Sequence, residues 1–281
     1  MKAGSLSYYT DLAREDYYLK GGEPPGLWLG EGSKLLGLTG VVSKEQFQNL
    51  FRGFSPDGQI ALVQNAGRIR SDGRLAHHPG WDLTFSAPKA VSVLWSQLDS
   101  DSRKHIENAH LRGVKAAIAI IEEYAAYTKR GHGGSIHEQV AGLVVAAFEH
   151  GTSRAMDPQL HTHVLVMNLA PRSDDTWGTL IGRHLFLIKM VAGAIYRSHL
   201  SHHLRKHHHL QTYPMPHGFG ITGLDPELLS HFSTRRKEIE LELASLGKFD
   251  AKTAARAALH TRRQKKHVSR QELFEQWQQI G

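Results

Sequence analysis

The sequence predicts an α+β fold, in which a strand-rich core is followed by a mainly helical part. A regular apolar face indicates one long helix, from about residue 101 to about Tyr127. Two apolar strand candidates follow, at residues 139–150 and 161–169. After Gly182 the apolar pattern becomes mainly helical. Strands that are grouped before helices are typical of the α+β arrangement.

The two helices of the expected core have recognisable start signals. Leu83–Phe85 indicates the end of a strand, and Ser86 then has the character of an N-cap, with Pro88 in the first turn of a helix. Asp101 or Ser102 is the predicted cap of the long helix. The glycines of residues 131–134 are expected to end that helix.

Further strand candidates surround the helical part. A turn-like stretch at residues 172–175 precedes the first of them, and the others lie after the His-rich stretch of residues 202–209. They are residues 176–181, 210–213 and 219–222. We therefore expect a core over about residues 1–182 and a mainly helical lobe over about residues 183–281.

Length and composition limit the class of protein. The 281 residues allow one large domain or two small ones, and the apolar share of 40% is ordinary for a globular protein. No apolar run approaches the roughly 18 residues that span a bilayer. The first 18 residues do not have the pattern of a secretion signal. The absence of cysteine excludes disulfides and cysteine nucleophiles, so we expect a cytoplasmic protein without membrane insertion.

The charge balance favours a polyanionic partner. The formal net charge is +7, with a pI near 9.5. Between Lys248 and Arg270 there are eight Lys or Arg residues against one acidic residue, Asp250. Such a basic segment is suited to contact the phosphates of a nucleic acid. The alternative at this point is a basic protein with no such partner.

Three histidines form a candidate metal site. His161 and His163 are two residues apart at the start of a predicted strand, so their side chains share one face. His150 ends the preceding strand candidate and would be the third ligand if the two strands pair. Three imidazoles leave coordination positions open for a substrate, as a catalytic metal site requires. Polar residues at a strand end are the alternative interpretation.

A carboxylate and several tyrosines complete the candidate site. Asp82 precedes Leu83–Phe85 and could accept a tyrosine proton or orient a ligand histidine, although a local turn bond is the simpler interpretation. Half of the eight tyrosines lie in two pairs, which begin at Tyr8 and Tyr17. A phenol, with a pKa of about 10, needs a cation and a base to attack phosphorus. Packing of these rings on the core is the alternative.

The combination of these motifs resembles a known family. The two tyrosine pairs are followed by the segments at residues 77–89 (HHPGWDLTFSAPK), 150–154 (HGTSR) and 157–163 (DPQLHTH). Each piece is weak alone, but the ordered set resembles the relaxase domain of F-type conjugative plasmids, the MOB-F class of the HUH endonucleases. The resemblance covers nearly the whole chain, including LGLTG at residues 36–40 and TRRQK at residues 261–265.

The resemblance implies a fold and a reaction. It implies a central antiparallel sheet with flanking helices and a C-terminal helical lobe that closes over single-stranded DNA, all within one relaxase domain. The implied reaction is a site- and strand-specific nick at a plasmid origin of transfer, through a covalent 5′-phosphotyrosyl intermediate.

The resemblance also implies roles for individual residues. Tyr8 matches the attacking tyrosine, and Tyr17 matches a tyrosine that performs a second strand transfer in some members. Asp82 matches the carboxylate beside the site. Arg154 and Lys265 match basic residues that stabilise the phosphate or the phenolate. His150, His161 and His163 match the metal ligands.

Cofactor and partners follow from the same resemblance. The expected ion is Mg or Mn, while imidazole ligands also suit Zn, Ni or Cu. The expected partners are single-stranded or hairpin DNA at an origin of transfer, other relaxosome proteins and secretion-system proteins, with transfer of the protein to a recipient cell as a consequence. No nucleotide cofactor is expected, because the covalent bond keeps the energy of the cleaved phosphodiester. Relatives usually continue into a helicase region, but this sequence has no P-loop pattern, since Gly247 and Lys248 are followed by Phe249, so unwinding of DNA by ATP hydrolysis is not expected.

Three alternatives remain open at this point. One is a rolling-circle replication initiator of the HUH class, in which the tyrosine often follows the histidines. Another is a non-catalytic single-strand DNA binder on the same fold. The third is a three-His metalloenzyme that hydrolyses its substrate with water. The position of the tyrosines before the histidines favours the relaxase.

Overall fold

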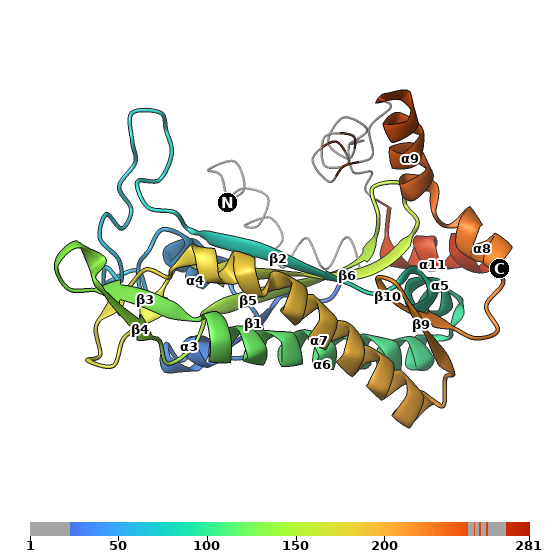
Figure 1. Ribbon diagram of the computed structural model, residues 1–281, viewed down its shortest axis with the longest axis horizontal. Helices are drawn as coiled ribbons and strands as arrows, with labels where there is room; N and C mark the ends of the chain where they lie inside the picture. The colour runs from blue at the N-terminus through green and yellow to red at the C-terminus, as the bar shows by residue number, and fades with distance from the viewer. Residues whose placement is uncertain (1–22, 247–249, 251–252, 254–256, 258–267) are drawn as a thin grey trace.

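The computed structural model describes residues 23–246, 250, 253, 257 and 268–281. These residues form an α+β fold, as the sequence predicts, around a four-stranded antiparallel sheet in the order β1-β5-β6-β2. Figure 1 shows the sheet lying along the length of the molecule, with long helices against one side. The bounds of its strands are β1 Leu27–Leu29, β2 Gly80–Ser86, β5 Val145–Thr152 and β6 Pro158–Met167.

The two central strands do pair, which is the condition for His150 to join the other two histidines. β5 and β6 are antiparallel neighbours, and His150 lies directly opposite His161. The predicted strand at residues 139–150 starts later, at Val145, because Ile136–Gln139 (β4) pairs instead with Tyr127–Arg130 (β3). The candidate at residues 176–181 shortens to Trp177–Gly178 (β8), which pairs with Ala170–Pro171 (β7).

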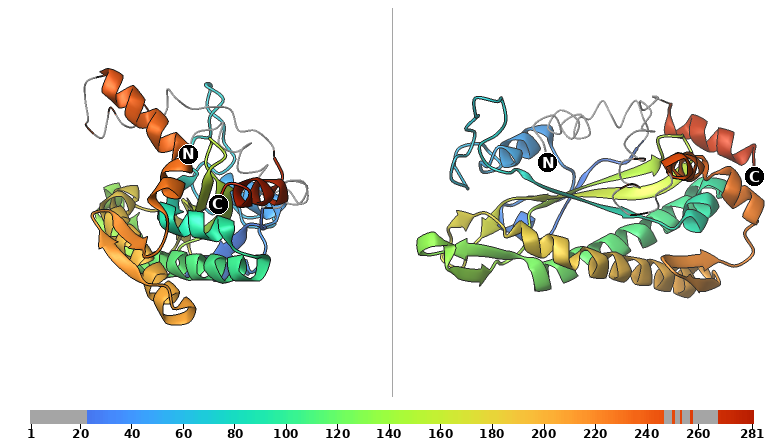
Figure 2. Two further views of the ribbon diagram at one scale, coloured as in Figure 1. Left: turned by 90° about the vertical axis from the view of Figure 1, so that its right-hand side faces the viewer. Right: turned by 45° about the horizontal axis from the view of Figure 1, so that its top comes forward.

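One face of the sheet is covered by helices. α5 (Lys89–Gln97), α6 (Ser100–Ala125) and α7 (Gly182–His208) lie against it, and α6 and α7 run side by side in Figure 1 and Figure 2. Residues of β6 with even numbers point into this layer, where Leu160, Val164 and Val166 are fully buried with the apolar face of α6. The alternation of strand side chains therefore leaves the odd-numbered residues for the other face.

The opposite face is covered over only part of its length. Leu165 and Met167 pack there against α4 (Lys44–Phe51) and the segment that contains α3 (Glu31–Leu35). His161 and His163 have the same parity as Leu165 but lie beyond this cluster. The two histidines therefore stand on the part of the sheet face that the apolar cluster leaves uncovered.

The predicted helix starts were wrong by a few residues. Ser86 is still the last residue of β2, and the helix cap is Pro88. The cap of α6 is Asp99, whose carboxylate accepts from the N–H groups of Asp101 and Ser102. α6 also ends earlier than predicted, at Ala125, since β3 starts at Tyr127; the glycines of residues 132–134 form a short 3₁₀ turn (η1).

The C-terminal part is mainly helical, with one hairpin of β9 (Thr212–Met215) and β10 (Gly218–Ile221) close to the predicted positions. Its shorter helices are α8 Pro226–His231, α9 Thr234–Leu246 and α11 Arg270–Gln278. α11 packs on α5, with the rings of Trp95 and Phe274 4.8 Å apart. Among the described helices, none combines the length and apolarity that crossing a bilayer would need.

Candidate active site

Three imidazoles converge on the uncovered sheet face. One ligand atom from each of His150, His161 and His163 lies within 4.8 Å of the others. The ring centroids are 5.2–5.3 Å apart, and no two of the rings are coplanar. The register explains the convergence, because His150 and His161 are cross-strand partners while His163 follows on the same face. Within the described residues this is the one group of three His or acidic side chains with a metal-binding arrangement.

Hydrogen bonds orient two of the three rings. The Nδ1 of His161 lies 2.7 Å from the carbonyl oxygen of Gln159, and the Nδ1 of His163 lies 2.9 Å from Asp82 Oδ2. Carbonyl and carboxylate oxygens only accept, so both Nδ1 atoms donate. The lone pair of each neutral imidazole is then on Nε2, which is available to a metal. The donor set therefore fits a divalent cation that accepts imidazole ligands.

The neighbouring strand β2 supplies the carboxylate. Asp82 and Thr84 share the face of the histidines, because Thr84 is the cross-strand partner of His163. Both carboxylate oxygens of Asp82 are within 3.1 Å of His163 Nδ1, and Thr84 Oγ1 is 3.3 Å from it. The structure thus brings Asp82 into the site as a partner of a histidine, one of the two roles that the sequence suggested.

A buried polar chain supports the histidine strand from behind. Thr162 lies between His161 and His163 on the opposite face, and its hydroxyl is 2.8 Å from Nε2 of His110 on α6. The other nitrogen of His110 is 2.7 Å from the hydroxyl of Tyr196 on α7. Burial lowers the pKa of His110 to about 3, so the ring is neutral and can donate to one partner and accept from the other. These bonds fix β6 relative to both long helices.

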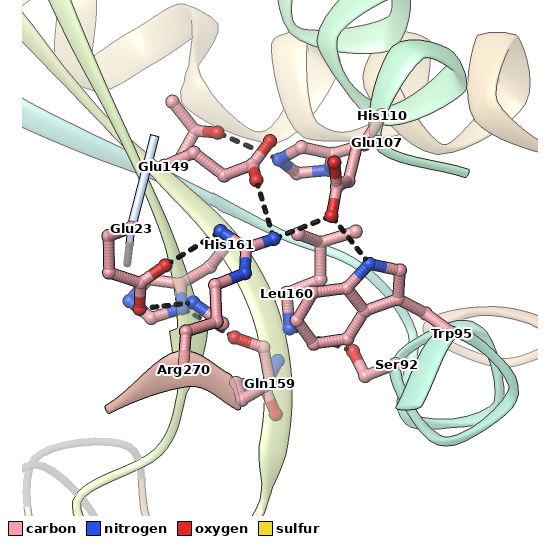
Figure 3. A network of polar contacts seen from close by, with 12 residues as sticks. Glu23, Ser92, Trp95, Glu107, His110, Glu149, Gln159, Leu160, His161 and Arg270 are labelled. Carbon is pink, nitrogen blue, oxygen red and sulfur yellow. Dashed lines mark hydrogen bonds and ion pairs between the residues drawn. The ribbon is translucent and has the colours of Figure 1, made fainter. Parts of the chain in front are cut away.

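A second, partly buried network connects distant parts of the chain behind the end of β5 that carries His150. Arg270, on α11, contacts Glu23 at 2.9 Å, Glu107 at 2.5 Å and Glu149 at 3.5 Å. Figure 3 shows the guanidinium in the middle of these carboxylates. Burial raises the pKa of Glu149 to about 8. Burial by itself would lower the pKa of Arg270, but the glutamates raise it above its ordinary value.

The remaining predicted site residues have different outcomes. Arg154 lies in the connection between β5 and β6, four residues after His150. This connection is held by Asp157, which is buried and accepts from the backbone N–H of Arg235. Tyr8, Tyr17 and Lys265, like most of the basic segment of residues 248–270, lie outside the described residues.

Some site features were not predicted. Thr84 and the carbonyl of Gln159 both contact histidines of the candidate metal site, and Arg270 contacts Glu149, the residue before His150. The alternation of Asp82, Thr84 and Ser86 along one strand could have placed Thr84 on the site face. The Arg270 contacts join residues up to 247 positions apart, and no local pattern indicates such contacts.

An exposed arm leads into the carboxylate-bearing strand. It comprises residues 64–76 and carries Arg68, Arg70 and Arg74, all exposed, with a single bridge between Ile69 and Leu75. Figure 1 shows the arm projecting from one end of the sheet, away from α6 and α7. Three guanidinium groups on a projecting arm are suited to contact phosphates at a distance from the histidines.

Comparisons with known proteins agree with this geometry. The family model of the TrwC relaxase matches residues 2–280. The chain is 36% identical to the multifunctional conjugation protein TraI of Escherichia coli, over 99% of this chain but 15% of that protein. The chain thus spans about one seventh of the length of this curated relative.

Solved structures give the same assignment. A metal-bound conjugative relaxase TrwC in complex with oriT DNA superposes with a TM-score of 0.85, at 29% identity, covering 99% of this chain and 94% of that one. TrwC complexed with a 27-mer DNA, described as comprising the recognition hairpin and the cleavage site, gives a TM-score of 0.83 at 28% identity with the same coverage. With its fold, its histidine site and these matches, the chain belongs to the TrwC relaxase family.

Proposed function

We propose that this chain nicks one DNA strand at a plasmid origin of transfer and remains attached to it through Tyr8. The observation that carries the proposal is the convergence of three imidazoles on an uncovered sheet face, with two Nδ1 atoms engaged by Gln159 and Asp82. Family membership and the DNA complexes of TrwC support it. The proposal treats residues 1–281 as one relaxase domain, with the core to about residue 182 and the DNA-clamping lobe beyond it.

His150, His161 and His163 would hold a divalent cation, which when bound polarises the scissile phosphate. Imidazole donors bind Zn, Ni or Cu more tightly than Mg or Mn, so availability in the cell decides which ion is present. We propose Mg or Mn in the cell. Asp82 orients His163 and is within reach of the site face, where it can also accept the phenolic proton.

The chain connectivity allows Tyr8 to reach this site. The carboxylate of Glu23 accepts from the backbone N–H of Gly151 at 3.0 Å, so the N-terminal segment joins the sheet beside His150. Tyr8 is fifteen residues before Glu23, and a fully extended chain of that length spans at most about 50 Å. Tyr17 is closer in sequence, which suits a second strand transfer.

The covalent step exchanges one phosphate ester for another. The phenolic oxygen of Tyr8 bonds to phosphorus, the bond to the 3′ oxygen breaks, and that oxygen leaves as a hydroxyl after it takes up a proton. Arg154 and Lys265 stabilise the charge that develops on the phosphate or the phenolate. The phosphotyrosyl ester keeps the energy of the original bond, so the 3′ hydroxyl can reseal the strand.

Recognition of DNA combines charge and single-strand access. The arm of residues 64–76 would contact the phosphates of an origin hairpin, and the basic segment of residues 248–270 those of the single strand. Other relaxosome and secretion-system proteins are further proposed partners, and the site of action is the cytoplasm, with passage to a recipient cell along with the DNA.

Formation of the covalent adduct tests the proposal. Overlapping single-stranded oligonucleotides that tile the replicon carrying the gene are incubated with the protein and Mn²⁺ and resolved on a denaturing gel. We expect one adduct, which maps to the transfer origin, with the DNA linked to the peptide that contains Tyr8 in mass spectrometry. Tyr8→Phe should abolish the adduct while metal binding remains.

Each rival function predicts a different result. A non-catalytic DNA binder gives retention on native gels but no adduct. A water-using metalloenzyme cleaves equally well after Tyr8→Phe. A replication initiator gives an adduct that maps to the origin of replication. Any of these results contradicts the proposed function.

A further inference from the structure

Arg270 occupies an unusual place for a cation. It is the first residue of α11, directly after the cap Ser269, which closes a capping box with Glu272. The positive end of the helix dipole disfavours a cation there. Its side chain nonetheless has only 12% of its surface exposed. Helix capping and the helix dipole therefore do not explain an arginine at this position, whereas its ion pairs with three glutamates do.

The carboxylates belong to three separate parts of the chain. Glu23 precedes β1, Glu107 belongs to α6, and Glu149 belongs to β5. The bond from Trp95 Nε1 to Glu107, at 2.9 Å, extends the network to α5. One guanidinium thus joins α11 to the segment before β1, to α6 and to β5 (Figure 3). Its planar set of five donors can serve several carboxylates at once, which an ammonium group cannot match.

Of the three glutamates, Glu23 is the one that connects the guanidinium to the backbone next to His150. One of its oxygens accepts from Gly151 N–H at 3.0 Å and the other from Arg270 at 2.9 Å. Gly151 follows the ligand His150, and a side chain at this position would meet the ring of Trp95 at 2.7 Å. Glu23 is therefore held between the strand end that carries His150 and the guanidinium of α11.

We infer that Arg270 is a positioning residue, which holds Glu23 against Gly151 and so anchors the tyrosine-bearing N-terminal segment beside His150. This inference rests on the proposed function, in which Tyr8 attacks at the histidine site. It also assigns the C-terminal helix a part in the reaction: without α11, the junction of the N-terminal segment with the sheet loses its ionic anchor. Loss of this anchor displaces the nucleophile but leaves the metal ligands in place.

The test separates attack from binding in the full chain. The single-turnover rate of adduct formation, the dissociation constant for the oligonucleotide and the affinity for Mn²⁺ are measured for Arg270→Met, Arg270→Lys and Glu23→Ala. Misplacement of a reacting group by about 1 Å can cost about 100-fold in rate. We expect Arg270→Met and Glu23→Ala to slow adduct formation by about 10- to 100-fold, while binding of DNA and of Mn²⁺ stays close to wild type. Arg270→Lys should recover part of the rate.

Arg103→Met is the matched control. The Arg103 guanidinium stacks 3.7 Å from the ring of Phe274, so its loss also removes a partly exposed cation that packs on α11. It should lower the thermal stability and leave the rate of adduct formation unchanged. If Arg270→Met does not fold, Glu23→Ala decides, because Arg270 then keeps Glu107 and Glu149 as partners.

Two kinds of failure are distinguishable. If wild-type protein forms no adduct, or forms it equally well after Tyr8→Phe, the proposed function is wrong. If wild-type protein forms a Tyr8 adduct but Glu23→Ala reacts at the rate of the Arg103→Met control, the anchoring inference is overturned and the function stands. Parallel losses of DNA or Mn²⁺ affinity in Glu23→Ala would also overturn it.

Discussion

The contact between Asp82 and His163 allows two roles of one carboxylate to be separated. Asp82→Ala removes the acceptor of the His163 Nδ1 proton, which lies 2.9 Å from Oδ2 and 3.1 Å from Oδ1. The ring then loses its fixed orientation and the negative charge that makes Nε2 a better donor. Loss of such a partner typically costs about 10- to 100-fold in metal affinity, which corresponds to about 1.4–2.7 kcal/mol.

Asp82→Asn should have a smaller effect on metal binding. The amide oxygen can still accept from Nδ1, so the orientation of the ring remains while the charge is lost. We therefore expect a loss of Mn²⁺ affinity below about 10-fold for Asp82→Asn. Thr84→Val is the control, because Thr84 Oγ1 contacts the same His163 Nδ1 at the longer distance of 3.3 Å and carries no charge. It should change the affinity little.

Calorimetric titration with Mn²⁺ measures these affinities. The rate of adduct formation at saturating Mn²⁺ tests whether Asp82 also accepts the phenolic proton. If Asp82 only orients His163, saturating metal restores the rate of Asp82→Asn. If Asp82 also takes the phenolic proton, the rate stays low even at saturation, and raising the pH recovers part of it. An Asp82→Ala protein that binds Mn²⁺ as tightly as wild type would refute the orienting role.

Three further predictions concern stability and DNA binding. Burial raises the pKa of Glu149 from 4.5 to about 8, so the stability that its protonated form contributes is complete below about pH 4.5 and is lost as the pH rises towards 8. Between pH 5 and pH 8, the free energy of unfolding measured in urea should therefore decrease less for Glu149→Gln than for wild type. Equal decreases would contradict this. Leu160→Ala removes a fully buried side chain between the sheet and its helices and should cost about 2–5 kcal/mol of unfolding free energy; a cost below about 1 kcal/mol in urea denaturation would mean that the site is not packed as described. Replacing Arg68, Arg70 and Arg74 by Gln should lower the affinity for origin hairpin DNA and reduce the salt slope by up to about three, as measured by fluorescence anisotropy over a salt series; an unchanged slope would show that the arm does not contact phosphates.

Much of the site could be predicted because its signals are local. The spacing of His161 and His163 places both rings on one strand face, and the ten residues before them leave room for a turn back to His150. The register of β5 and β6 then confirms the convergence. The helix boundaries were less accurate, since Asp99, Asp101 and Ser102 are all acceptable cap residues and the structure uses Asp99.

By itself the sequence determined the fold class and the spacing of the three histidines, because periodicity and strand alternation are properties of neighbouring residues. The family followed from the resemblance of its ordered motifs to known relaxases. The sequence suggested Asp82 as a partner of a histidine, but only the tertiary structure showed that this histidine is His163 and that Arg270 of α11 holds Glu23. Asp82 meets His163 across 81 positions, and Arg270 meets Glu23 across 247. Such contacts depend on which strands become neighbours and where a helix docks. These outcomes are set by the burial of the whole core, and no local pattern records them.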